Sequence, residues 1–382
     1  FFSFFIILFF KKKIFKKEKL IYLFFGIYFL AQIPGLIFSE NKFENIYLII
    51  SALTAILTII LIEEFFSKDE KKIFIYICFC ILFIVFFLNF IPQIKLYIEG
   101  QQIFYGGLTE ESEIFFGKDS PRSSGSSRTC LILIILLFIL EKNLFKKKKF
   151  FSKSLIVLLL TSILLYQSRT IIFTTIIIFS FIFIYENDFS LKKIIKFIAI
   201  YFIIPFLIFT ISINFYANQK YEFIKKYIEK EKISKLEKSK KIDKLEKRII
   251  LRKFSDFSSG RFEDWKNIYN EFSNKNIFFG YGSQADRYLI NQSASNGLIY
   301  ALTSSGIFGL TFFILFSLIV LKKISICMMN FKQTDYINYF FSLLILSIFL
   351  RSLLETSYSA YGIDFMIAIT AICFINNFKT KN

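Results

Sequence analysis

The chain has 382 residues, of which 55% are hydrophobic, and its mean hydropathy is +0.56. Soluble proteins contain about 45–50% apolar residues, and here the apolar residues form long runs with lysines between them. This pattern indicates a polytopic membrane protein, so the net charge of +19 needs a topological explanation and does not indicate nucleic-acid binding. The sequence contains no histidine, which excludes any mechanism that uses an imidazole.

The runs and breaks predict an all-α, polytopic transmembrane helix bundle with eleven visible spans. A span needs about 20 residues, so we expect the half-length apolar run at the start to belong to a truncated N-terminus, with a twelfth span upstream. The expected spans are 1–10 (partial), 20–38, 45–62, 73–91, 126–140, 154–166, 171–185, 194–213, 297–320, 336–354 and 358–376.

Lysine and arginine predict the orientation of these spans. One set of short loops carries 23 basic residues and the opposite set carries 7, so we expect the first set and the C-terminus to be cytoplasmic. The long hydrophilic insert 214–294 then lies on the outer side, where the positive-inside rule does not count its charges. This predicts three parts: an N-terminal bundle 1–213, the extracytoplasmic helical insert 214–294, and C-terminal helices 295–382.

The first half of the insert, 220–253, has no Gly or Pro and mixes acidic and basic residues at helical spacing. It predicts a solvated helical arm. The arm can rest on the outer leaflet as an amphipathic helix, or its basic surface can gather an anionic glycan or a lipid diphosphate. None of the five cysteines lies in the insert, so no disulfide framework is expected there.

The second half of the insert carries a more specific pattern. Ser259-Gly260-Arg261 precedes a helical segment that contains the only tryptophan, Trp265. Then come the turn Gly280-Tyr281-Gly282 and the pair Ser295-Asn296, and an apolar segment begins directly after that pair. That segment contains the small residues Ser304, Ser305, Gly306 and Gly309, which permit close helix packing.

The order of these motifs resembles the O-antigen ligase/polymerase family. In that family a Ser-Gly-Arg and a nearby Trp are followed by a Gly-x-Gly, and then by an Asn before an apolar segment. Three further features agree with the family: a Ser-Arg turn between two short spans, an arginine-bearing segment before an earlier span, and an Arg–Glu pair near the end of a late span. They are Ser168-Arg169-Thr170, residues 121–125, and Arg351 with Glu355.

The resemblance implies a membrane glycosyltransferase of the bacterial inner membrane that uses a polyprenyl-diphosphate-linked glycan. The family commonly has His-Asn where this chain has Ser295-Asn296, and the ligase histidine is thought to take part in catalysis. Since this chain has no histidine, we expect a polymerase that extends lipid-linked repeat units. Two alternatives stay open: a ligase that transfers finished glycan to lipid A core, and, from another class, a lipid-linked oligosaccharide flippase or transporter.

Transfer from a lipid diphosphate requires stabilisation of the departing negative charge, for which guanidinium groups are suited. The predicted cytoplasmic loops contain only lysine, whereas all eight arginines fall on the predicted outer side. We predict that Arg169 and Arg261 take part in catalysis. Arg169 is the strongest candidate because an unpaired charge at membrane depth is costly. We predict that four more bind substrate: Arg122, Arg128, Arg287 and Arg351.

A carboxylate is also needed if the acceptor hydroxyl is deprotonated in the reaction. We rank Glu355 and Asp264 first, although Glu355 lies one helical turn after Arg351 and can form a simple intrahelical ion pair with it. The other acidic candidates are Glu263, Asp119 and Asp286. The remaining candidates for substrate contact are Tyr281 and Tyr288, which can stack on sugars, and Ser295 and Asn296.

The sequence offers no cluster of histidine, cysteine and carboxylate residues, and arginines can supply the positive charge, so we expect no metal ion and no other cofactor. The expected partners are the lipid-linked glycan, the bilayer, and a flippase and chain-length regulator of the same pathway. A single external insert rich in arginine favours an enzyme over a transporter, because transporters usually show internal repeats or charges deep within several spans.

Overall fold

The computed structural model describes residues 20–39, 41–65, 67–100, 123–143, 149–186, 190–230, 261–272, 277–290 and 293–376. Every regular element in these ranges is helical, which confirms the predicted all-α membrane fold. The chain divides into two compact units, one made of 1–70 with 257–382 and the other of 71–256. The predicted division at 213 and 294 stays a prediction.

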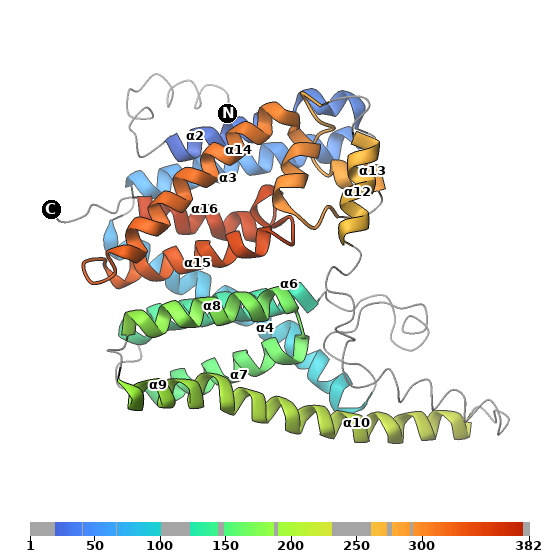
Figure 1. Cartoon of the computed structure of the whole chain (residues 1–382), viewed down its shortest axis with the longest axis vertical. Coiled ribbons are helices and arrows are strands. Elements are labelled where there is room, and N and C mark those ends of the chain that lie inside the picture. Colours follow the sequence, from blue (N-terminus) through green and yellow to red (C-terminus); the bar gives the residue numbers. More distant parts are fainter. Residues whose placement is uncertain are drawn as a thin grey trace. The chain divides into compact units, whose positions relative to one another are not determined.

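In the first unit, the early and late parts of the chain pack together. The α2 helix (Leu20–Leu30) lies along α14 (Gly297–Met329), while α3 (Lys42–Phe65) contacts α16 (Ile363–Asn376), which packs against α15 (Tyr336–Ser352) (Figure 1). Aromatic rings fill the interior, and Phe25 of α2 stacks on Phe316 of α14 with 4.0 Å between ring centroids. The short 3-10 helix η2 (Pro34–Phe38) follows α2, and a second one, η4 (Ser357–Ser359), lies between α15 and α16.

The second half of the predicted insert belongs to this same unit. Its helices α12 (Arg261–Phe272) and α13 (Ala285–Ile290) contact each other and the first part of α14. Ile268 of α12 forms a small buried core with Ala294 and Tyr300. The polar insert is therefore anchored to a membrane helix through a few apolar side chains.

The second unit contains α4 (Lys68–Ile98, beginning just before the boundary), α6 (Ser123–Asn143), α7 (Lys149–Tyr166), α8 (Arg169–Glu186) and α9 (Leu191–Ile198). A π-helical segment, η3 (Ala199–Ile203), joins α9 to α10 (Ile204–Lys230). Pro205 stands just after the π-segment. Because proline lacks a backbone N–H, the regular α-helical bonding pattern cannot pass through it unchanged.

The ten predicted spans that fall in the described ranges each coincide with an apolar helix. In the part of the chain that the structure describes, seven helices are long and apolar enough to cross a bilayer, and three shorter apolar helices accompany them. The last helix begins at Ile363, not at 358, because Ser357–Ser359 forms η4. The partial span 1–10 lies outside the described residues. The charged arm is described only to Lys230, where it continues α10 as a helix.

Candidate functional site

The start of α14 is held by the side chain of Asn296. Its Oδ1 accepts from the backbone N–H groups of Leu298 and Ile299 at 2.9 and 3.0 Å, which is the geometry of a helix N-cap. Its Nδ2 donates to the carbonyl of Leu353 at 3.0 Å, just after the end of α15. Asn296, predicted to bind substrate, thus also joins the beginning of α14 to the segment that follows Arg351.

Ser295 has a positive φ of 49°. Non-glycine residues rarely adopt this conformation, so it indicates a turn that its surroundings enforce. The preceding residue, Ala294, donates its N–H to Asp286 Oδ2 at 2.6 Å and accepts from Trp265 Nε1 at 2.7 Å. Both side chains come from the insert, one from α13 and one from α12.

Arg351, at the end of α15, donates from Nη1 to Asp364 Oδ2 and from Nη2 to Glu355 Oε2. Asp364 lies in the first turn of α16. The side chain of Asp364 is 5% exposed and that of Glu355 is 20% exposed, so the guanidinium sits between a buried and an accessible carboxylate. Sequence reasoning found the Arg351–Glu355 pair but gave Asp364 no role, although an acid inside a membrane helix is a signal of a buried partner.

α14 is broken at Gly306, whose φ of 64° and ψ of −169° are not helical. Residues 277–282 lie against this break and complete its backbone hydrogen bonding. Tyr281 and Gly282 donate to the carbonyls of Thr303 and Ser304 at 2.8 and 2.9 Å, and Ile307 donates to Ile277 at 2.9 Å. The backbone of the predicted Gly-x-Gly turn therefore packs directly against the break in α14. Glycine suits these positions because it lets the two backbones come close together. A Cβ on Gly280 would lie 2.6 Å from the nitrogen of Gly306.

Tyr281 packs between Phe38 of η2 and Phe272 of α12, with ring centroids 6.2 and 5.9 Å away. Burial, followed by the nearby Glu271 carboxylate, raises the pKa of the Tyr281 phenol, which therefore stays protonated at neutral pH. Arg287 is exposed on α13 beside Gln284, and the Gln284 side chain donates to Glu44 at 2.9 Å. This contact joins the insert to the start of α3.

The α12 helix begins with Arg261, followed in its first turn by Glu263 and Asp264. Acidic residues are favourable there because of the helix dipole, whereas a cation is not. The helix dipole therefore does not account for Arg261, while Asp264 has a structural explanation beside its predicted catalytic one. Asp264 is half-buried and Glu263 is exposed.

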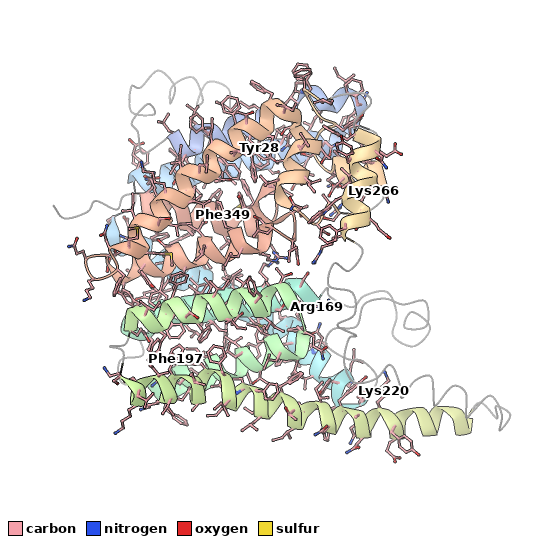
Figure 2. All side chains as sticks on the ribbon, in the orientation of Figure 1. Tyr28, Arg169, Phe197, Lys220, Lys266 and Phe349 are labelled. Atoms are coloured by element: carbon pink, nitrogen blue, oxygen red, sulfur yellow. The ribbon has the colours of Figure 1, made fainter. Side chains whose placement is uncertain are left out.

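In the second unit, Ser168 lies between α7 and α8, and Arg169 is the first residue of α8 (Figure 2). The predicted turn Ser168-Arg169-Thr170 is thus shorter than expected, because Arg169 and Thr170 already belong to the helix. Gln167 has a φ of 49°, and the Ser168 carbonyl accepts from Ile172 at 2.9 Å. Like Arg261, Arg169 stands at a helix N-terminus, where its charge does not favour the helix dipole.

The end of α7 beside this turn is tied to α4, because the Tyr166 hydroxyl donates to Gln93 Oε1 at 2.6 Å. The α7 helix also packs against α6, on which Arg128 is half-buried. Arg122 and Asp119 lie outside the described residues.

The structure therefore brings Ser295, Asn296, Arg351 and Glu355 to one end of the first unit, and it places Arg169 and Arg128 in the second unit. Asp286 and Trp265 contribute contacts that sequence reasoning had not assigned, although both residues stood in the motif-bearing segment. Within the ranges that the structure describes, no group of three or more His, Cys, Asp or Glu side chains is placed to hold a metal ion.

Residues 154–314 match the family model described as O-Antigen ligase. This segment includes Arg169, Trp265, Ser295-Asn296 and the glycines of α14, and it ends before Arg351. The search of curated proteins and the search of solved structures each found no match. The family match over this segment confirms the resemblance to the O-antigen ligase/polymerase family that the sequence motifs indicate. The apolar helices and the family match together indicate a multi-pass membrane protein of the ligase/polymerase type.

Proposed function

We propose that this chain polymerises polyprenyl-diphosphate-linked oligosaccharide repeat units on the outer face of the bacterial inner membrane. The observation that carries the choice of polymerase over ligase is Ser295, which stands in the enforced turn before α14 where the family commonly has histidine. With no histidine in the chain, no imidazole elsewhere can replace it.

The reaction joins an acceptor hydroxyl to the anomeric carbon of the donor glycan while the bond from that carbon to the lipid diphosphate breaks. The lipid diphosphate leaves with the bonding electrons and therefore gains negative charge. Arginine stabilises such charge without a metal ion, because its planar fork donates two hydrogen bonds to phosphate oxygens. Arg169 and Arg261 are proposed for this role because each stands in a motif that resembles the family, Ser168-Arg169-Thr170 and Ser259-Gly260-Arg261.

The hydroxyl proton has to be taken up by a base as the new bond forms. Glu355 is the proposed base, with Asp264 as second choice. Of the two carboxylates that accept from Arg351, Glu355 is the accessible one, so a substrate hydroxyl can reach it more easily than the buried Asp364. Arg351 then fixes the position of the base and can also bind substrate, as can Arg122, Arg128 and Arg287.

The test is a length assay with the purified chain in liposomes. The donor is a native extract of lipid-linked repeat units from a strain that lacks the protein, supplied without lipid A core and without ATP. We expect the lipid-linked glycan to lengthen. Glycan transfer that appears only after core acceptor is added would overturn the proposal in favour of a ligase. Movement of the lipid between leaflets with unchanged glycan length would favour a flippase.

A further inference from the structure

Side chains of the insert form hydrogen bonds with both backbone polar groups of Ala294. Its N–H donates to Asp286 at 2.6 Å, and its carbonyl accepts from Trp265 at 2.7 Å. Ala294 is 0% exposed and packs with Ile268 and Tyr300. The two side chains come from different helices, so the peptide groups of Ala294 connect α12 to α13 immediately before α14.

Asp286 is itself oriented by its surroundings. Its Oδ1 accepts from the backbone N–H of Arg287 at 3.0 Å while its Oδ2 accepts from Ala294, and the residue is 2% exposed. A buried carboxylate is costly unless it receives hydrogen bonds, and bonds to a charged acceptor are stronger than neutral ones. The hydrogen bond from the Ala294 N–H to Asp286 is therefore strong, and breaking it would leave the buried carboxylate short of one hydrogen bond.

Trp265 is the only tryptophan in the chain. Its ring lies edge-on to Phe262, with 5.2 Å between centroids, and its Nε1–H is directed to the Ala294 carbonyl. Phenylalanine could retain the ring packing but has no donor. The indole nitrogen thus supplies the part of this contact that another aromatic residue cannot.

The residues that follow Ala294 belong to the candidate site. Ser295 adopts the left-handed conformation, and Asn296 then caps α14 and donates to Leu353 beyond Arg351. The direction in which the chain leaves Ala294 decides where Ser295 and Asn296 point. Misplacement of a reacting or binding group by about 1 Å can cost roughly 100-fold in rate.

We propose that Trp265 and Asp286 are positioning residues, which together hold Ala294 and so set the orientation of the Ser295–Asn296 turn for glycan transfer. This inference rests on the proposed function in one respect, namely that the turn is part of the reaction site. Because one side chain binds the N–H of Ala294 and the other binds its carbonyl, loss of either one releases the turn. Loss of the second then has little further effect on turnover.

The first measurement concerns the turn itself and needs no glycan transfer. Ser295→Cys is introduced, and its rate of maleimide labelling is compared with that of the parent chain, whose five native cysteines give the background. Adding Trp265→Phe or Asp286→Asn should raise the labelling rate several-fold. Asp286 accepts hydrogen bonds from two backbone N–H groups. Asparagine has only one acceptor oxygen, and its NH₂ group would face the other N–H, so one of the two bonds is lost. Unchanged labelling in both variants overturns the inference.

The second measurement is turnover in chains that retain Ser295. Trp265→Phe and Asp286→Asn should each lower kcat by about 10- to 100-fold with a much smaller change in KM, and the double variant should match the single ones. Matched controls are Tyr269→Phe on the exposed face of α12 and Asp335→Asn, an exposed acid that makes no capping hydrogen bond. Both controls should keep the parent kcat.

The two measurements separate the inference from the proposed function. Faster labelling together with unchanged kcat shows that the turn is not part of the reaction site, and it overturns the positioning role. If the parent chain transfers no glycan, the proposed function fails, while the labelling result still decides whether Trp265 and Asp286 hold the turn. A loss of kcat in variants that keep the thermal unfolding temperature of the parent chain supports positioning over general destabilisation.

Discussion

Arg351 contacts two carboxylates that differ in burial, and this difference separates their effects. Asp364→Asn leaves the buried guanidinium without its buried counter-charge, so we expect roughly 3 kcal/mol loss of stability. Glu355→Gln should cost less than about 1 kcal/mol, because Glu355 is partly exposed. Thermal unfolding of the purified variants in detergent measures both changes. Equal losses would show that exposure does not distinguish the two pairs.

Glu355→Gln also tests the proposed base. The amide keeps the size of the side chain but cannot accept a proton, so turnover should fall by about 100-fold or more. Glu355→Asp is the matched variant, because it keeps the carboxylate and shifts its position. The length assay at saturating donor measures the rate. A rate near that of the parent chain for Glu355→Gln would remove Glu355 as the base and leave Asp264 as the next candidate.

Arg169 is testable by a substitution that keeps its charge. Arg169→Lys replaces a two-pronged donor with a point ammonium, so turnover should fall strongly while folding and membrane insertion are retained. Lys95→Arg, another basic position on the same predicted side, is the matched control and should have no effect on turnover. Full activity of Arg169→Ala in the length assay would exclude Arg169 from the mechanism.

The break in α14 depends on glycine at a single position. Gly306 has a conformation that is essentially restricted to glycine, and a Cβ there would collide with the Phe278 carbonyl. Gly306→Ala should therefore destabilise the chain by at least about 2 kcal/mol, or prevent correct insertion. Gly26→Ala in α2 is the matched control, since nothing lies within 4 Å of its added Cβ. Thermal unfolding that is the same for both variants would contradict the close backbone packing.

At the scale of the whole molecule, the open prediction is orientation across the membrane. Lys266 on α12 and Lys332 between α14 and α15 are both exposed. The excess of basic residues predicts that they lie on opposite sides. Lys266→Cys should be labelled from outside in cells with a permeabilised outer membrane, whereas Lys332→Cys should be labelled only after lysis. The reverse pattern would invert the topology and place the insert in the cytoplasm.

The helices and their limits were largely predictable, because each apolar run is long enough to require a helix that satisfies its own backbone groups in a membrane. The errors fell where local hydrogen bonding decides the boundary. One example is η4 at Ser357–Ser359, which delays the start of α16, and another is Arg169, which the sequence pattern left outside α8. Hydropathy does not register a cap or a turn of a few residues.

The family and the candidate residues also came from the sequence by itself, since the order of short motifs and the absence of histidine can be read along the chain. Only the tertiary structure decided which of these residues meet. Asn296 reaches Leu353, Arg351 lies between Asp364 and Glu355, and Trp265 and Asp286 hold Ala294. These contacts depend on directional hydrogen bonds between helix ends, and such bonds leave no periodic signal in the sequence because their partners are brought together only when the helices pack.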